Sequence, residues 1–206
     1  LIFVALWIKL TSKGPVFFRQ IRIGQDGRRF TLLKFRSMKT GADTGTHEKY
    51  FKHLVESGGS MIKLDALDDP RLIPGGKILR ASGLDELPQL WHVVRGTMSL
   101  VGPRPCTAEE FECFNEWQKS RVKAPPGLTG YWQVNGKNKT TFNQMIDMDI
   151  KYAERMSPLF DLAILAATAP AILLQIVEAS KSRAASAPVT RSAPAPLRGH
   201  STQQIS

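Results

Sequence analysis

The chain has 206 residues, and its 28 Lys and Arg against 18 Asp and Glu give a formal charge of +10. This length suits one domain with a sizeable core and is short for two. Two cysteines seven residues apart, Cys106 and Cys113, exclude a disulfide framework or a metal knuckle, and the four histidines do not cluster with cysteine or carboxylate, so zinc is not indicated.

The excess positive charge is concentrated at the two ends of the chain. Residues 1–40 hold nine basic residues and one acid, and residues 180–206 hold four basic residues and no acid. A basic segment that directly follows an apolar one is typical of an anchor at an anionic membrane face. Nucleic acid is the competing partner for such a charge, but the sequence contains no nucleic-acid-binding motif. We therefore expect a membrane partner and no nucleic acid.

An apolar run opens the sequence, from Leu1 to Ile8, and it is far shorter than the roughly 20 residues of a spanning helix. It ends in Trp7, Lys9 and Lys13, a combination typical of the membrane interface. We interpret this run as the second limb of a membrane-dipping hairpin, truncated at its start, in a longer protein. A buried helix of a soluble protein is the alternative interpretation.

A β-hairpin is predicted next. Val16 to Ile23 is rich in β-branched and aromatic residues, Gly24 to Gly27 is a turn, and Arg28 to Phe35 returns as a second strand. From Thr40 to Ser60, the content of Gly, Thr and Ser predicts a flexible loop, with one helical turn or two between His47 and Val55.

Two adjacent carboxylates, Asp85 and Glu86, lie just ahead of a helix-like apolar pattern. If Asp85 is the N-cap, a proline falls in the first turn, where its missing N–H costs nothing. The competing register places the N-cap at Ser82 and leaves both carboxylates freer to react. The helix is expected to run from Asp85 to about Val94, because Arg95-Gly96-Thr97 is typical of a helix C-terminus.

This carboxylate pair is compatible with phosphoryl chemistry. A carboxylate can take a phosphoryl group from an activated donor when a divalent cation neutralises the donor phosphates. A second carboxylate can help to hold that cation together with water molecules, as Mg²⁺ prefers. Most Asp-Glu pairs are solvated helix starts, and the dipeptide alone favours that simpler interpretation.

A stiff loop is predicted from Val101 to Pro105, because each of its two prolines fixes its own φ and restricts the residue before it. Such stiffness favours a role for Arg104 as a fixed guanidinium that binds phosphate or nucleotide. The alternative is a structural arginine that ties the loop to a carbonyl oxygen.

After this loop, Thr107 to Glu110 is predicted to form a capping box that opens a helix. The aromatic residues that follow, Phe111, Phe114 and Trp117, are expected in the core. Gly127 to Gly136 is expected to be an irregular segment that could line a nucleotide or sugar pocket, because glycine lets the backbone approach a ligand closely.

Two further helices are predicted, from Thr140 to Tyr152 and from Leu159 to about Val177. The second is long enough to span a membrane. Because Asp161 and Pro170 interrupt it, we favour an amphipathic helix that lies at the membrane interface. Beyond Ser180, the content of Ala, Pro, Ser and Arg predicts a disordered tail.

Several short motifs along residues 1 to 175 carry a family resemblance. In chain order they are Ser12 to Gln20, Lys34 to Met38, Asp69 to Arg71, Leu84 to Leu90, Met98 to Pro105, Pro126 to Gly130, Gln133 to Asn138 and Asp149 to Tyr152. In this order they resemble the bacterial sugar transferase family, the monotopic polyprenol-phosphate phosphoglycosyl transferases that begin the assembly of cell-surface polysaccharides and glycoproteins.

The resemblance implies a set of site residues. Asp85 would be the nucleophile, Glu86 would bind the metal or orient Asp85, and both are expected ligands of Mg²⁺. The residues expected to bind substrate are Lys34, Arg36, Arg80, Arg104, Lys137 and Asp149. Lys137 stands where arginine is frequent in the family, and lysine lacks the bidentate fork. For Asp149, a solvated helix face is the alternative.

The predicted fold class is α+β: a mainly helical, membrane-associated domain with a small antiparallel β-hairpin, a truncated membrane-dipping N-terminal helix and a disordered C-terminal tail. Residues 1–13 would form the membrane limb, residues 14–178 the catalytic domain and residues 179–206 the tail. The resemblance implies a location at the bacterial inner (cytoplasmic) membrane, with the catalytic domain on the cytoplasmic face. It leaves the oligomeric state open, a homo-oligomer included.

The resemblance implies transfer of a sugar-1-phosphate from a nucleotide sugar, a UDP-sugar above all, to undecaprenyl phosphate through a covalent aspartyl-phosphosugar intermediate. Such a step would initiate the assembly of exopolysaccharide, capsule, O-antigen or glycoprotein glycan. The alternatives are a Mg²⁺-dependent phosphohydrolase that uses the same two carboxylates and a catalytically silent membrane scaffold for polysaccharide assembly.

Overall fold

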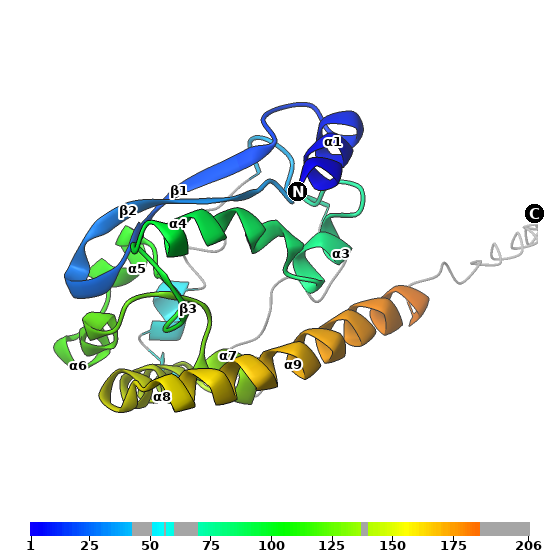
Figure 1. The fold of residues 1–206 in the computed structure, drawn as a ribbon. Coiled ribbons are helices and arrows are strands. Elements are labelled where there is room, and N and C mark those ends of the chain that lie inside the picture. The colour runs from blue at the N-terminus through cyan, green and yellow to red at the C-terminus, as the bar shows by residue number, and fades with distance from the viewer. Residues whose placement is uncertain (43–50, 56, 60–69, 137–139, 186–206) are drawn as a thin grey trace, which may run out of the picture.

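The computed structural model describes residues 1–42, 51–55, 57–59, 70–136 and 140–185, and Figure 1 shows their arrangement. A two-stranded hairpin lies over a run of short helices, and a long helix lies on the opposite side of the molecule. This mixed α and β fold with a small antiparallel hairpin confirms the predicted class at that level. Residues 43–50, 56 and 60 of the loop predicted from Thr40 to Ser60 lie outside the described residues, and residues 51–55 are helical, within the range predicted for one or two helical turns.

The predicted hairpin is confirmed. Strands β1 (Phe17–Ile23) and β2 (Arg29–Phe35) pair antiparallel, with Phe17 opposite Phe35 and Ile23 opposite Arg29. The connecting turn, η1 (Gln25–Gly27), holds Asp26 at φ 55°, a left-handed conformation that aspartate tolerates better than most residues.

A second, parallel pair joins β3 (Ser99–Val101) to β4 (Gly127–Thr129). The expectation of an irregular segment from Gly127 to Gly136 is therefore wrong, because β4 is followed after one residue by α7 (Tyr131–Asn135). That this segment lines a nucleotide or sugar pocket stays a prediction. A Cβ atom at Gly127 would overlap the backbone of Gly102, so the absence of a side chain serves backbone contact between the strands.

The carboxylate segment forms a run of short helices: α3 (Gly76–Ala81), η3 (Leu84–Gln89) and α4 (Leu90–Val94). Neither predicted register is correct, because Gly83 at φ 70° is the N-cap of η3. The hydroxyl of Ser82 accepts a hydrogen bond from the Leu84 N–H instead. The predicted stop is confirmed, since α4 ends at Val94 and is followed by a glycine at φ 73°.

The helix predicted after the Arg104 loop is broken into short pieces. These are α5 (Ala108–Glu112), α6 (Glu116–Lys119) and η4 (Ser120–Lys123). The capping box from Thr107 to Glu110 is confirmed, but a second box from Asn115 to Gln118 starts a new helix and redirects the chain. As a result, Trp117 is 43% exposed, against the prediction that it lies in the core.

Two packed helices complete the fold, α8 (Phe142–Arg155) and α9 (Pro158–Ala185). Tyr152 joins them to the sheet, because its hydroxyl lies 3.0 Å from the Val101 carbonyl oxygen and 2.8 Å from Asp161 Oδ1. Helix α9 continues through Ala185, so the first residues of the predicted tail are helical. The rest of that tail lies outside the described residues.

The N-terminal helix α1 (Ile2–Thr11) packs against the main domain. Ile8 is fully buried with Phe35, Ile73 and Leu79, and the Trp7 indole N–H donates to the Pro74 carbonyl oxygen at 3.2 Å. The opposite side of α1 leaves large apolar residues exposed. Among the described residues, no helix combines the length and the hydropathy needed to cross a membrane.

Candidate active site

The two carboxylates lie in the first turn of η3, beneath the β-hairpin. Asp85 is 5% exposed, whereas Glu86 is partly exposed. Burial raises the pKa of Asp85 from 3.8 to about 6, and the neighbouring Glu86 charge adds to this effect. A buried carboxylate with a raised pKa beside a partly exposed one is an unsymmetrical pair, in which the two groups are suited to different tasks.

Three cations surround this pair and lower the pKa of Asp85 against the effect of burial: Lys34 from β2, Arg80 from α3 and Arg104 from the loop after β3. Arg104 Nη1 lies 3.5 Å from Glu86 Oε1. The ammonium of Lys34 lies 5.2 Å from the centre of the Phe18 ring. Burial, and then the charge of Arg104, lower the pKa of Lys34 to about 8. The structure thus brings together five of the predicted site residues.

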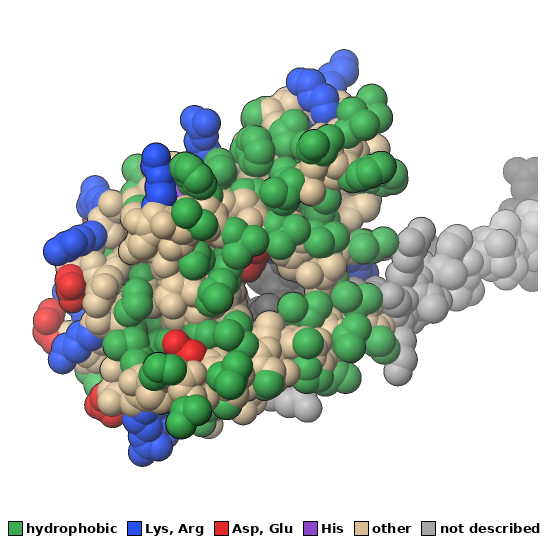
Figure 2. Space-filling view, viewed as in Figure 1, with side chains coloured by type: hydrophobic (Ala, Val, Ile, Leu, Met, Phe, Trp, Pro, Cys, Tyr) green, Lys and Arg blue, Asp and Glu red, His purple; other side chains and the backbone are tan. Residues whose placement is uncertain are grey.

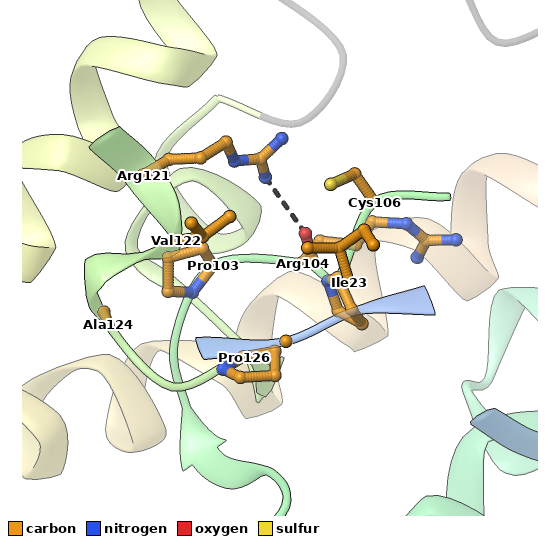
Figure 3. A pocket seen from close by; sticks show the side chains of 10 residues that line it. Ile23, Pro103, Arg104, Cys106, Arg121, Val122, Ala124 and Pro126 are labelled. Atoms are coloured by element: carbon orange, nitrogen blue, oxygen red, sulfur yellow. Dashed lines mark hydrogen bonds between the residues drawn. The ribbon is translucent and has the colours of Figure 1, made fainter. Parts of the chain in front are cut away.

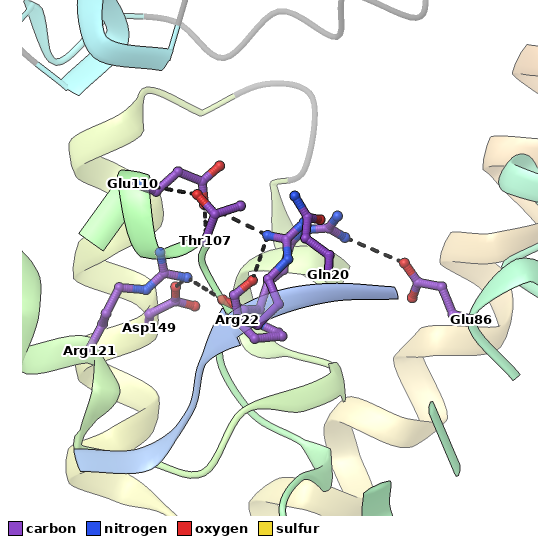
Figure 4. Close-up of polar contacts among 9 residues, drawn as sticks. Gln20, Arg22, Glu86, Thr107, Glu110, Arg121 and Asp149 are labelled. Atoms are coloured by element: carbon purple, nitrogen blue, oxygen red, sulfur yellow. Dashed lines mark hydrogen bonds and ion pairs between the residues drawn. The ribbon is translucent and has the colours of Figure 1, made fainter. Parts of the chain in front are cut away.

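Arg22 belongs to the same cluster and was missed from the sequence. It is buried, and its Nη2 donates to Gln20 Oε1 at 2.7 Å (Figure 4). Burial, then the charge of Arg104, lower its pKa to about 10. Strand alternation could have identified it, because Gln20 and Arg22 share one face of β1 and Lys34 lies opposite Phe18 on that face.

The guanidinium group of Arg36 forms hydrogen bonds within the protein. Its Nε donates to the Pro15 carbonyl oxygen at 2.6 Å, and its two terminal nitrogens donate to Ser12 Oγ at 2.8 Å and to the Ser12 carbonyl oxygen at 3.0 Å. These contacts tie the end of α1 to the hairpin. Substrate contact by Arg36 stays a prediction that these contacts do not support.

Asp149 lies in the interior, 2% exposed, and forms an ion pair with Arg121. Burial raises the pKa of Asp149 to about 6, and Arg121 opposes this shift. The alternative of a solvated helix face is therefore wrong for Asp149, although Asp147 on the same helix is exposed. Contact of Asp149 with a donor stays a prediction, and Lys137 lies outside the described residues.

A divalent metal has a limited but suitable donor set here. Within the described ranges, no group of three or more His, Cys, Asp or Glu side chains lies close enough to hold a metal ion. Mg²⁺ does not require one, since it commonly binds one or two carboxylates and completes its coordination with water and substrate phosphates. Asp85 and Glu86 supply those two carboxylates. The nearby cations Lys34, Arg80 and Arg104 could balance the phosphate charge that the metal does not neutralise.

A small depression lies behind the Arg104 loop and is shown in Figure 3. Pro103, Cys106, Val122 and Pro126 are among its lining residues. It has room for about one water molecule, which is far less than a nucleotide sugar requires. We therefore place the chemistry on the open side of the loop, where Arg104 meets Glu86.

A buried carboxylate, a second carboxylate and three nearby lysine and arginine side chains are suited to phosphate-group chemistry. The comparison with known families then identifies the protein: it belongs to the bacterial sugar transferase family, whose model matches residues 1–175. The resemblance drawn from the sequence motifs is confirmed.

Curated relatives support this assignment. The chain is 41% identical over 165 residues to "Galactosyl transferase CpsE" of Streptococcus agalactiae serotype III, covering 78% of this chain and 35% of the relative. It is 38% identical over 170 residues to "Exopolysaccharide production protein ExoY" of Sinorhizobium fredii, covering 81% and 74%. It is also 38% identical over 180 residues to the "UDP-glucose:undecaprenyl-phosphate glucose-1-phosphate transferase" of Xanthomonas campestris pv. campestris, covering 84% and 34%. The chain thus spans about a third of the streptococcal and Xanthomonas relatives and about three quarters of ExoY.

Proposed function

We propose that this protein transfers a sugar-1-phosphate from a UDP-sugar to undecaprenyl phosphate, through a phosphosugar held covalently on Asp85. The observation that carries the proposal is the buried Asp85 next to Glu86 within the group formed by Lys34, Arg80 and Arg104. The printed name of the Xanthomonas relative supports this donor and acceptor class. Initiation of a cell-surface polysaccharide would be the consequence.

In the first step, the Asp85 carboxylate oxygen attacks the phosphorus that bears the sugar, and the bond from that phosphorus to the UMP oxygen breaks. UMP leaves with the bonding electron pair, and an acyl-phosphate diester remains on Asp85. In the second step, an oxygen of the lipid phosphate attacks the same phosphorus. This attack restores the Asp85 carboxylate and forms the lipid-linked diphosphate sugar.

The cations determine when Asp85 can react. Burial alone would keep the carboxyl protonated well above its usual pKa, and the surrounding positive charges limit that rise to about 6. At neutral pH the group is therefore ionised and weakly solvated, which suits a nucleophile. Lys34, Arg80 and Arg104 would also balance the charge of the donor phosphates. Mg²⁺, held by Asp85 and Glu86, would neutralise phosphate charge during the attack.

We also propose that the catalytic domain lies at the cytoplasmic face of the bacterial inner membrane, because the acceptor phosphate lies at the depth of the lipid headgroups. The face in Figure 2 carries hydrophobic side chains over α1 and along α9. Exposed large apolar residues include Ile2, Phe3, Leu10, Trp91, Val94, Leu159, Leu162, Leu173 and Leu174. Such a surface fits an interfacial protein whose chain dips into one leaflet.

A radiolabelled transfer assay tests the proposed function. Protein in lipid nanodiscs is given Mg²⁺ and UDP-sugars labelled in the phosphate that bears the sugar, with and without undecaprenyl phosphate. We expect multiple-turnover UMP release that requires the lipid phosphate, with the label recovered in lipid; without the lipid, UMP should not exceed one equivalent per protein, with the label held on the protein. Label in free sugar phosphate would instead identify the phosphohydrolase, and absence of UMP from every donor in the panel would refute the transferase.

Substitution of Lys34 by glutamine is expected to shift the acid limb of the pH profile of kcat/KM upward by about 1 unit. In the wild type this limb should lie near the Asp85 pKa of about 6, because only the ionised carboxylate attacks. Loss of the Lys34 charge removes a contribution that lowers that pKa. The matched control is Lys119→Gln, whose lysine pairs with the exposed Glu116, and its limb should not move. An unchanged limb in Lys34→Gln would argue against Asp85 as the titrating group.

A further inference from the structure

The backbone of the Arg104 loop is held by two buried arginines. Arg121 Nη2 donates to the Arg104 carbonyl oxygen at 3.0 Å (Figure 3). Arg22 Nη1 donates to the next carbonyl oxygen along the chain, that of Pro105, at 3.0 Å. Two consecutive carbonyl groups are thus fixed by two separate guanidinium groups, from η4 and from β1.

Each arginine is itself paired with a carboxylate, as Figure 4 shows. Arg121 lies 2.5 Å from Asp149 Oδ2, and Arg22 lies 3.8 Å from Glu110 Oε2. The first pair is almost completely buried, with side chains 5% and 3% exposed. Because a buried ion pair often gives no more stability than apolar residues of similar volume, this pair is weak evidence for a purely stabilising role.

The side chain of Arg104 needs such support. It is 45% exposed, and its ion pair with Glu86 is long, at 3.5 Å. An exposed arginine has many accessible rotamers, and its direction therefore depends on where its backbone is held. The flanking prolines restrict φ but have no N–H to donate. At these positions the loop backbone can therefore be fixed by hydrogen bonds only through its carbonyl oxygens.

We propose that Arg121, held in place by Asp149, is a positioning residue that fixes Arg104 for binding of the donor phosphates. The proposal rests on the proposed function for its substrate, but its core is that Arg121 acts on a phosphate ligand through Arg104. Both contacts are made by one terminal nitrogen, Arg121 Nη2, whose two N–H bonds are fixed in the guanidinium plane. Lysine at position 121 would keep the charge but not this fixed planar geometry. Arg121→Lys should therefore weaken phosphate binding without removing a phosphate-binding group.

A double-mutant cycle tests this in the full chain, with inorganic pyrophosphate as the probe and calorimetry as the measurement. The variants are Arg121→Lys, Arg104→Ala, Arg80→Ala and the two double variants that combine Arg121→Lys with each alanine change. Arg29→Lys is the control, because Arg29 is exposed and pairs with the equally exposed Glu112 at 3.9 Å. Unfolding temperatures are recorded for every variant.

We expect Arg121→Lys to weaken pyrophosphate binding by about tenfold. On the Arg104→Ala background the same change should have no further effect, whereas on the Arg80→Ala background the full loss should remain. Arg29→Lys should bind like the wild type. A general structural role of Arg121 would not distinguish the two backgrounds, so this difference is the specific signature of positioning.

Equal losses on both backgrounds, or wild-type affinity in Arg121→Lys, would overturn the inference, as would pyrophosphate binding that does not depend on Arg104. If Arg121→Lys unfolds below the assay temperature, Asp149→Asn takes its place in the same cycle. A protein that shows the expected cycle but releases no UMP from any UDP-sugar would refute the proposed function and leave the positioning role of Arg121 supported.

Discussion

Replacement of Asp85 by asparagine is expected to abolish sugar-phosphate transfer and, at the same time, to stabilise the fold. The amide cannot form the acyl phosphate, so lipid-dependent UMP release should fall by more than about a thousandfold. The stabilisation follows from burial, which raises the Asp85 pKa from 3.8 to about 6. Above that pH the folded protein must hold a poorly solvated charge, at a cost on the order of 3 kcal/mol.

The stability difference between the wild type and Asp85→Asn should depend on pH. Because the folded state binds the proton more tightly than the unfolded state, the wild type loses stability as the pH rises from about 4 through 6. Asp85→Asn should therefore be more stable than the wild type at pH 7.5 and should lose that advantage near pH 4. Denaturant unfolding at both pH values measures it. The control is Asp147→Asn on the exposed face of α8, which should change neither stability nor activity.

Full UMP release by Asp85→Asn would remove Asp85 as the nucleophile. Loss of activity with reduced stability at pH 7.5 would show instead that the carboxylate supports the fold, which contradicts the raised pKa. Because the two readouts move in opposite directions only if Asp85 is a destabilising functional group, their combination is more informative than activity alone.

Substitution of Gly127 by alanine is expected to have the largest effect on stability. The added Cβ would overlap the Gly102 N, the Val101 carbonyl carbon and the Thr129 carbonyl oxygen, all of which are backbone atoms that cannot rotate away. The loss should exceed about 3 kcal/mol, enough to lower the melting temperature by roughly 10 °C. Since Gly127 pairs with β3, the strand that leads into the Arg104 loop, transfer activity should fall with it.

The matched control for Gly127→Ala is Gly96→Ala. Gly96 has φ 73°, but nothing lies within 4 Å of its added Cβ, so only the left-handed backbone opposes alanine there. Its cost should be about 1–2 kcal/mol. Thermal unfolding by circular dichroism compares the two variants. Equal losses would mean that backbone conformation, rather than the contact between β3 and β4, limits Gly127.

The features that the sequence predicted well are those determined by neighbouring residues. The hairpin follows from two runs of strand-forming residues around a glycine turn, and the capping box at Thr107 involves residues three positions apart. The carboxylate pair and its three cations were identified by family motifs, and the structure brings them together. Their catalytic roles stay predictions, because proximity and charge are compatible with more than one reaction.

The errors concern features that depend on distant parts of the chain. The sequence predicts an irregular segment from Gly127 to Gly136, because the contact of Gly127 with Gly102, which directly follows β3, cannot be predicted from local sequence. The Asp85 register was wrong because a left-handed Gly83 starts η3, a choice that helix propensities do not predict. The buried position of Arg121 was not predicted, since nothing in its local sequence indicates its buried partner on α8, Asp149. Sequence patterns predict elements, whereas the pairing of buried charges emerges only when the elements pack.

Helix α1 has a thermodynamic consequence for the enzyme. Ile8 shares a buried cluster with Phe35 at the end of the hairpin and with Leu79, one residue before Arg80, so α1 cannot detach without exposing the framework of the site. Anything that binds the outward apolar side of α1 in the folded state therefore stabilises the whole domain by mass action. A bilayer that binds there would act as a ligand of the native state, and its composition would be a term in the folding equilibrium of the catalytic domain.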